Sequence, residues 1–143
     1  MAFNPEELIF PALECVHIAG FAVAIGTVGV VDFRLLDIGF QGQTPAQLAK
    51  DTRFWTLGGL LVAIFSGFGI YATDPDMYYT NWPFLIKMAC LIAAIVFHYT
   101  VHRKAADVEA PSSGAKVIAI VSLLLWISII FGGIFIAFIS SGL

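Results

Sequence analysis

The chain has 143 residues, of which 59% are hydrophobic and only 12% are charged. Soluble domains carry about 25% charged residues, so this composition excludes an ordinary soluble domain and indicates an integral membrane protein. The formal net charge of -3 gives no argument for a nucleic-acid partner, and none is expected.

Four apolar runs are each close to the length of about 20 residues that an α-helix needs to cross a bilayer. Turn-forming residues separate them: Gly39 and Pro45 in the first connection, the segment TDPD in the second and APSSG in the third. The sequence therefore predicts an all-α fold, a single four-helix membrane bundle covering residues 1–143. The expected spans are residues 8–31, 54–72, 82–102 and 116–138.

The first connection ends in the segment TPAQLAKDTRFW, in which Thr44 and Pro45 are placed as the N-cap and first residue of a helix. We expect a short interfacial helix here, leading into the second span. Positively charged loops face the cytoplasm, so both chain termini are expected outside, on the periplasmic side. Six of the seven Lys and Arg residues support this orientation, because they lie in or beside the first and third connections: Arg34, Lys50, Arg53, Arg103, Lys104 and Lys116.

Small residues recur at every fourth position in two spans. Such stripes let helix backbones approach closely, and we favour this interpretation over a stripe that clears room for a flat ligand. Because four short helices leave little shielded volume for a ligand, we also expect a homo-oligomer. Cys15 and Cys90 lie inside apolar runs and are predicted to be buried thiols. The stripes are Gly59, Ala63 and Gly67 in the second span and Gly133, Ala137 and Ser141 in the fourth.

The first span carries one histidine, His17. Ionisable groups inside a membrane are costly, so each is a functional candidate by default. Glu14 lies one turn before His17, and the small residues Gly20, Ala24 and Thr27 continue the same face. A planar macrocycle could lie against such a wall. The alternative is a structural histidine that hydrogen-bonds with Glu14 or with a backbone carbonyl.

The third span carries Lys87, His98 and His102. Lys87 and His98 are 11 residues apart, which places them on one stripe of a helix with 3.6 residues per turn. Lys87 either snorkels to the membrane surface or pairs with a ligand carboxylate, and His98 is either a ligand or a structural histidine. His102 adjoins Arg103 and Lys104, and we expect water and lipid headgroups to reach it.

These groups suit haem b better than a bare metal ion. Zinc sites combine several Cys, His or carboxylate ligands at short spacing, and copper sites often bring methionine clusters; neither pattern is present. Haem b needs one or two imidazoles, an apolar slot and cations or donors for its propionates. The sequence supplies all three, and His17 and His98 are the expected iron ligands, with His102 a weaker candidate.

A known family shares part of this pattern. The segment WPFLIKMACLIAAIVFHYTVHRK, residues 82–104, resembles the helix of HemJ-type membrane proteins that opens with Trp, carries a Lys and reaches a His eleven residues later, before basic residues. An early His17 and a later Arg34 on the first helix resemble the HemJ arrangement as well. The wider resemblance extends to CopD-like and uncharacterised four-helix bacterial membrane proteins. In this chain the first helix ends DFRLLDIGF and lacks the Tyr-His that follows the Arg in typical HemJ sequences.

The resemblance implies that His17 is a haem-associated histidine, that Lys87 is a functional lysine and that His98 closes the third-helix motif. We therefore expect a small b-type cytochrome in a bacterial inner membrane, exchanging electrons with a quinone or a redox partner protein. One alternative is a HemJ-like protoporphyrinogen IX oxidase in which Lys87 or Arg34 holds a propionate of the porphyrin substrate. Another is a non-redox metal or solute permease, or an assembly subunit.

The depths of the two expected ligands differ. Counted from the outer ends of their helices, His98 lies about 6 to 9 Å deeper than His17. One iron between them therefore requires a tilted or kinked helix.

Overall fold

The structure, a computed structural model, describes residues 8–140, apart from the side chain of Ser140. Within this range the regular structure is helical, and four helical stretches are long and apolar enough to cross a membrane. This confirms the expected bundle of four apolar helices. Ser141, the last member of the small-residue stripe in the fourth span, lies outside the described residues. The four stretches are 9–35, 45–73, 82–106 and 113–139.

The first two long helices are α1 (Ile9–Leu35) and α2 (Pro45–Thr73). Thr44 caps α2 as predicted: its hydroxyl accepts from the backbone N–H of Gln47, and the Gln47 side chain accepts from the backbone N–H of Thr44. The separate interfacial helix is not found. Residues 45–53 form the first turns of α2 itself, because the cap and Pro45 start one helix and no Gly or Pro interrupts it before the second span.

The second connection contains a short helix, α3 (Pro75–Tyr79), where the sequence predicted a turn. Asp74 caps it, since its carboxylate accepts from the backbone N–H of Met77. The third span consists of α4 (Trp82–Phe97), the π-helical turn η2 (His98–His102) and α5 (Arg103–Ala106), and the fourth is α6 (Ser113–Ser140). Nothing in the sequence predicted the π-helical turn.

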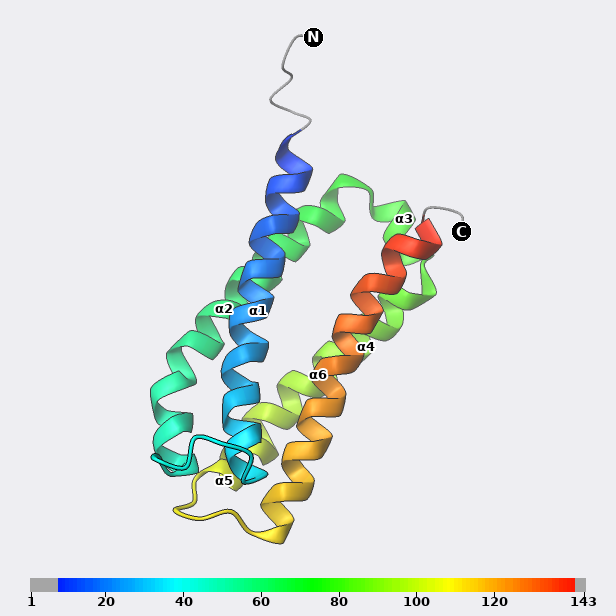
Figure 1. The fold of residues 1–143 in the computed structure, drawn as a ribbon. Helices are drawn as coiled ribbons and strands as arrows, with labels where there is room; N and C mark the ends of the chain where they lie inside the picture. Colours follow the sequence, from blue (N-terminus) through cyan, green and yellow to red (C-terminus); the bar gives the residue numbers. More distant parts are fainter. Residues whose placement is uncertain (1–7, 141–143) are drawn as a thin grey trace.

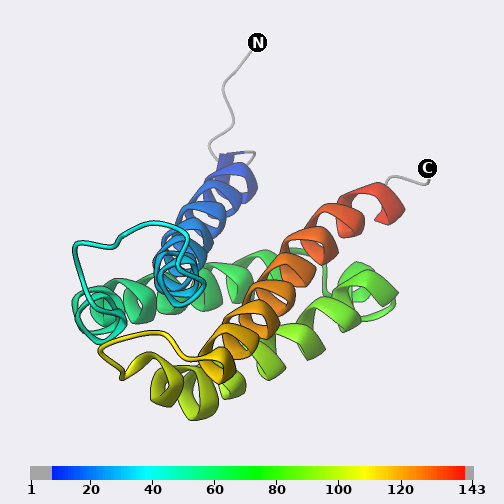
Figure 2. The same ribbon diagram turned by 60° about the horizontal axis from the view of Figure 1, so that its bottom comes forward.

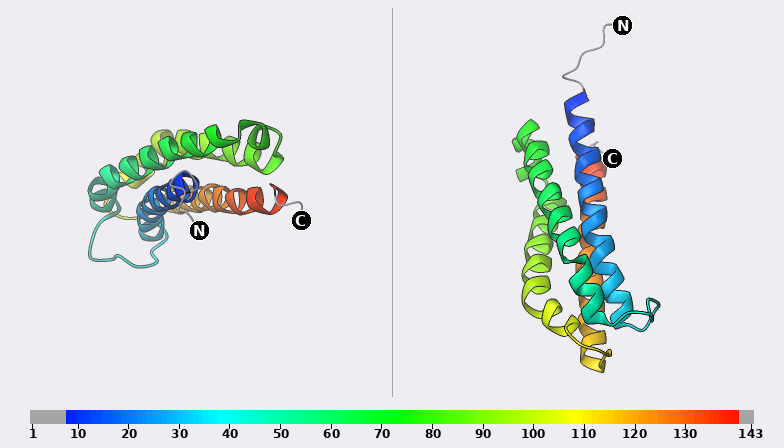
Figure 3. Two further views of the ribbon diagram at one scale, coloured as in Figure 1. Left: turned by 90° about the horizontal axis from the view of Figure 1, so that it is seen from above. Right: turned by 90° about the vertical axis from the view of Figure 1, so that its left-hand side faces the viewer.

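The long helices form two layers (Figures 1 and 3). α2 and α4 make up one layer and α1 and α6 the other; α1 packs along α2, α4 packs along α6, and α1 also contacts α6. The start of α1, the end of α6 and α3 lie together at one end of the bundle, which we call the α3 end. At the opposite end, residues 36–44 and 107–112 connect the helices (Figure 2). We call it the basic end, because the six Lys and Arg residues of the first and third connections belong to it.

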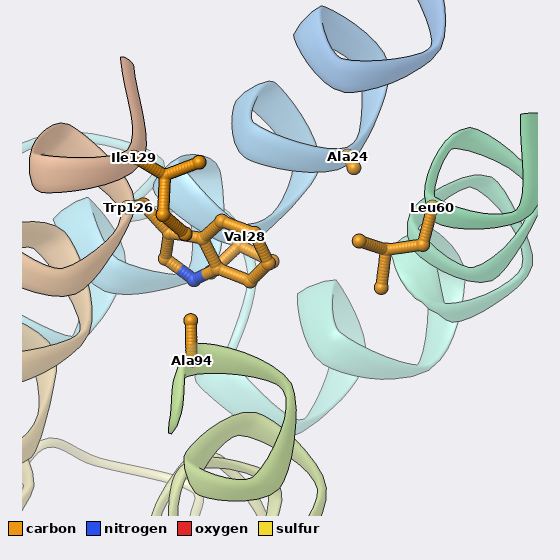
Figure 4. Packing of buried hydrophobic residues seen from close by; sticks show 6 residues of the cluster. All are labelled: Ala24, Val28, Leu60, Ala94, Trp126 and Ile129. Atoms are coloured by element: carbon orange, nitrogen blue, oxygen red, sulfur yellow. The ribbon is translucent and has the colours of Figure 1, made fainter. Parts of the chain in front are cut away.

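The centre of the bundle is an apolar cluster to which α1, α2, α4 and α6 all contribute (Figure 4). A second cluster lies nearer the basic end. Together they hold the two layers in contact over the middle of the bundle. The central cluster consists of Ala24, Val28, Leu60, Ala94, Trp126 and Ile129, and the second of Val31, Leu35, Leu48, Ala106, Ala115 and Ala119.

The backbones of α1 and α2 touch. A Cβ atom on Gly59 would lie 2.6 Å from the carbonyl oxygen of Gly20 and 2.7 Å from the backbone nitrogen of Ala24. The small-residue stripe of the second span therefore serves helix packing, as the favoured interpretation had it. The face of α1 that runs through Gly20 and Ala24 is covered by α2, so the expectation that a planar macrocycle lies against this wall is wrong.

The two cysteines differ from the prediction. Cys15 is exposed and Cys90 is half-buried, and both are free thiols. Their helices need no protein partner at these positions, because the surrounding lipid accepts a small apolar side chain.

Candidate functional site

His17 and Lys87 meet in a small cavity of about 30 Å³ towards the α3 end, bordered by α1, α2, α4 and α6. The Nδ1–H of His17 donates to the carbonyl oxygen of Ala63 at 2.7 Å. Of the two partners considered for a structural histidine, Glu14 and a backbone carbonyl, the carbonyl is the one found. The ring stacks on Phe21, with the ring planes 3° apart. A cavity of this size accommodates about one or two water molecules, which excludes a porphyrin.

Glycines of neighbouring helices make room for both side chains. A Cβ atom on Gly67 would lie 3.0 Å from Cε1 of His17, and one on Gly132 would lie 3.0 Å from Cβ of Lys87. Gly133 lies beside the Lys87 Nζ, which would be 3.6 Å from a Cβ there. Among residues 8–140, no carboxylate forms an ion pair with Lys87.

A much larger cavity, of about 670 Å³, lies at the basic end between α1, α2, η2 and α5. At this end α2 packs along α1 and touches the third span mainly through α5. Its volume is within the range of about 300 to 1,000 Å³ that is usual for small-molecule and cofactor sites. Apolar side chains such as Val28, Val31 and Leu57 line it together with two imidazoles and four cations: His98, His102, Lys50, Arg53, Arg103 and Lys104.

Three polar side chains from three helices meet beside this cavity: Asp32 of α1, His102 of η2 and Ser122 of α6. The Nε2–H of His102 donates to Asp32 Oδ1 at 2.6 Å, and the Ser122 hydroxyl donates to Asp32 Oδ2 at 2.8 Å. His102 is only 1% exposed, so the expectation that water and headgroups reach it is wrong. A carboxylate inside a span needs partners, and His102 is buried because it is one of them.

Sequence reasoning missed Asp32 as a site residue. The predicted first span ended at Val31, whereas α1 continues to Leu35 and therefore places Asp32 inside the helix. The available signal was helical continuity: residues 31–35 contain no Gly or Pro, so the helix has no reason to stop at the first charged residue.

His98 also lines the large cavity. Neither of its ring nitrogens has a hydrogen-bond partner among the described residues, and its Nδ1 is fully buried. The ring stacks on His102 with centroids 4.9 Å apart and planes at 26°, and it meets the Tyr99 ring edge-on at 4.9 Å. The π-helical turn carries both histidines, and such turns occur frequently at functional sites.

The structure thus separates the two histidines that the sequence assigned to one iron. His17 and Lys87 line the small cavity, His98 and His102 line the large one, and the two cavities share no lining residue. An iron ligated by both His17 and His98 has no common cavity in this fold.

Arg34 lines neither cavity. Its Nε donates to the carbonyl oxygen of Gln43 at 2.7 Å and its Nη1 to Asp37 at 3.1 Å. Lys116 donates to the same carboxylate at 2.8 Å. Arg34 therefore ties the first connection to the end of α1, and its guanidinium is not placed to hold a ligand in the large cavity.

The lining of the large cavity contains an imidazole, apolar side chains and cations, which are groups that haem b would need. Residues 8–140 contain no group of three His, Cys, Asp or Glu that could hold a bare metal ion, whereas a haem brings its own ring nitrogens and needs only an axial ligand from the protein. The guanidinium of Arg53 lies 4.6 Å from the centroid of Phe54, and that of Arg103 lies 5.7 Å from the centroid of Tyr99. These contacts favour a fixed position for two of the cations that propionates would need.

The sequence matches DUF6644, a family of unknown function, over residues 9–139. Because the match covers most of the chain, the protein belongs to this family. No curated protein and no solved structure matches it.

Proposed function

We propose that this member of the DUF6644 family is a haem b-binding membrane protein, a small b-type cytochrome whose haem occupies the large cavity. The observation that carries the proposal is a free imidazole beside four cations in one cavity of about 670 Å³. The resemblance of residues 82–104 to HemJ-type proteins supports it independently. The proposed location is a bacterial inner membrane, with both termini periplasmic, which rests on that resemblance and on the positions of Lys and Arg.

His98 is the residue that would ligate the haem iron. It is the imidazole of the cavity that has no hydrogen-bond partner, whereas Asp32 already engages Nε2 of His102. His17, expected as the second ligand, lies in the small cavity. The proposal therefore assigns one protein ligand to the iron.

The cations at the basic end have the second role. Lys50, Arg53, Arg103 and Lys104 would bind the two propionates by charge-assisted hydrogen bonds. When bound, haem supplies a one-electron couple. The proposed haem site is at the basic end of the bundle, where a quinone in the bilayer or a partner protein at its surface can approach.

The visible and pyridine-haemochrome spectra of the protein, purified after haem-replete expression, test this proposal. We expect a Soret band and the α-band of a b-type haem. A folded, purified chain without a Soret band would rule the proposal out.

The oxidase alternative uses the same cavity, because a porphyrinogen carries the same propionates as haem. Arg34 and Lys87, the residues first expected to hold a propionate of the substrate, lie outside this cavity. Arg53 and Arg103 would hold the propionate instead. Expression in cells that lack their own protoporphyrinogen oxidase separates the two functions. Restored haem synthesis supports the oxidase, and failure with confirmed expression leaves electron transfer.

A further inference from the structure

Asp32 occupies a position where a carboxylate is energetically unfavourable. Its side chain is completely buried within a membrane-spanning helix, where an ionisable group costs several kcal/mol unless it is paired. Its two oxygens are used on two different helices, one by His102 and the other by Ser122. The pairing explains how Asp32 is tolerated, but a packed apolar residue would avoid the cost altogether.

Asp32 is connected to the large cavity through two contacts, its hydrogen bond with His102 and the stacking of His102 on His98. His102, held by Asp32, offers its ring face to His98 at a centroid distance of 4.9 Å. His98 has no hydrogen bond of its own among the described residues to fix its ring. The ring contacts that hold it are the stacking on His102 and a T-shaped contact with Tyr99.

We propose that Asp32 is a positioning residue for the large cavity: anchored by Ser122, it fixes His102, and the His102 ring sets the orientation of the His98 imidazole that faces the ligand. The inference rests on the proposed function only for the identity of that ligand. The positioning of His98 is a property of the protein alone.

The stacking geometry separates this role from direct metal binding by the pair. The two rings are within 26° of parallel. Because the lone pair of an imidazole nitrogen lies in the ring plane, two nearly parallel rings direct their lone pairs side by side and not towards one ion. Asp32 and His102 thus act on the ligand through His98. A carboxylate that accepts from a histidine ring N–H holds the orientation of that ring, and the ring that Asp32 holds is that of His102.

Nuclear magnetic resonance of the histidine rings tests the positioning directly. The chain has three histidines, so selective ¹⁵N labelling in detergent micelles gives three sets of ring resonances, assigned with H17A, H98A and H102A. We expect D32N to shift the resonances of both His102 and His98 and to leave those of His17 in place. S122A, which keeps the carboxylate and removes its anchor, should shift the same two sets by a smaller amount. D37N, which removes an exposed carboxylate just beyond α1, is the matched control and should shift none.

A D32N spectrum in which only His102 moves would overturn the proposal, because His98 would then be held without it. If D32N does not fold, S122A decides by the same criterion. In haem-loaded protein, D32N should retain the Soret band but change the ferric electron paramagnetic resonance signal, because His98 would ligate the iron; an unchanged signal counts against the proposal. Wild-type protein that binds no haem contradicts the proposed function, while the ring resonances still decide the positioning role.

Discussion

His98 and His102 stack with their ring centroids 4.9 Å apart, yet only His102 is held by a carboxylate. The His102 imidazole is thus hydrogen-bonded within the protein, whereas the His98 imidazole has no such bond and lines a cavity of about 670 Å³.

Replacing His98 should abolish haem binding. We expect the H98A protein to fold and to lose most of its Soret absorbance per chain, because no other free imidazole lines the large cavity among the described residues. H17A is the matched control and should keep wild-type haem content, since His17 lies in the small cavity. The ratio of Soret to protein absorbance measures both, and loss of haem in H17A alone would reverse the assignment.

Removing the cations of the cavity should weaken haem binding. We expect R53A and R103A each to raise the haem dissociation constant about tenfold, which corresponds to about 1.4 kcal/mol and to the loss of a charge-assisted hydrogen bond. R34A, whose guanidinium binds Gln43 and Asp37 instead, serves as control. Titration of haem-depleted protein gives the constants, and equal affinities for wild type and an R53A/R103A double variant would argue against propionate binding at this end.

Adding a methyl group at Gly59 should loosen the contact between α1 and α2. The new Cβ would lie 2.6 Å from the carbonyl oxygen of Gly20, so the helices must separate, and we expect a loss of about 1 to 3 kcal/mol in the free energy of unfolding. G58A is the neighbouring control, because a Cβ there meets nothing within 4 Å. Thermal unfolding in detergent compares them, and equal stability of the two variants would contradict the close approach.

The ion pairs of Asp37 should make part of the stability pH-dependent. The hydrogen bond from the Lys116 ammonium, followed by the interaction with Arg34, holds the pKa of Asp37 below its ordinary value of 3.8. The native carboxylate thus binds its proton at lower pH than the unfolded one, so the stabilisation is complete above pH 3.8 and is lost as the pH falls through the native pKa. We expect D37N to have a lower melting temperature than wild type at pH 7 and a matching one in strong acid. A constant difference at every pH would exclude this origin.

The positions of Lys and Arg predict that the basic end faces the cytoplasm. Reporter fusions at the C-terminus, at the end of the chain that follows α6, test this. Alkaline phosphatase should be active there and green fluorescent protein dark, because both then lie outside. The opposite pattern would show that the bundle is inserted the other way round.

Several features of the fold follow from the sequence because they depend on residues close together in the chain. The lengths of the apolar runs predicted four spanning helices, and Thr44 with Pro45 predicted the start of α2, since capping involves only the first turn. Helical spacing also predicted that Lys87 and His98 lie on one stripe, whereas in the structure they line two different cavities. The end of α1 was less predictable, because hydropathy falls at Asp32 whereas its buried partners come from two other helices.

The sequence by itself determined the number of spans, the residues that carry ionisable groups and their spacing along each helix. Only the tertiary structure decided which of these groups share a cavity. The contact of Gly59 with Gly20 closes α2 onto α1 and covers the wall on which a macrocycle was expected, whereas the separation of α2 from α4 leaves the large cavity beside His98. Both outcomes depend on how side chains fit between helices that are distant in the chain, and no periodicity along one helix contains that information.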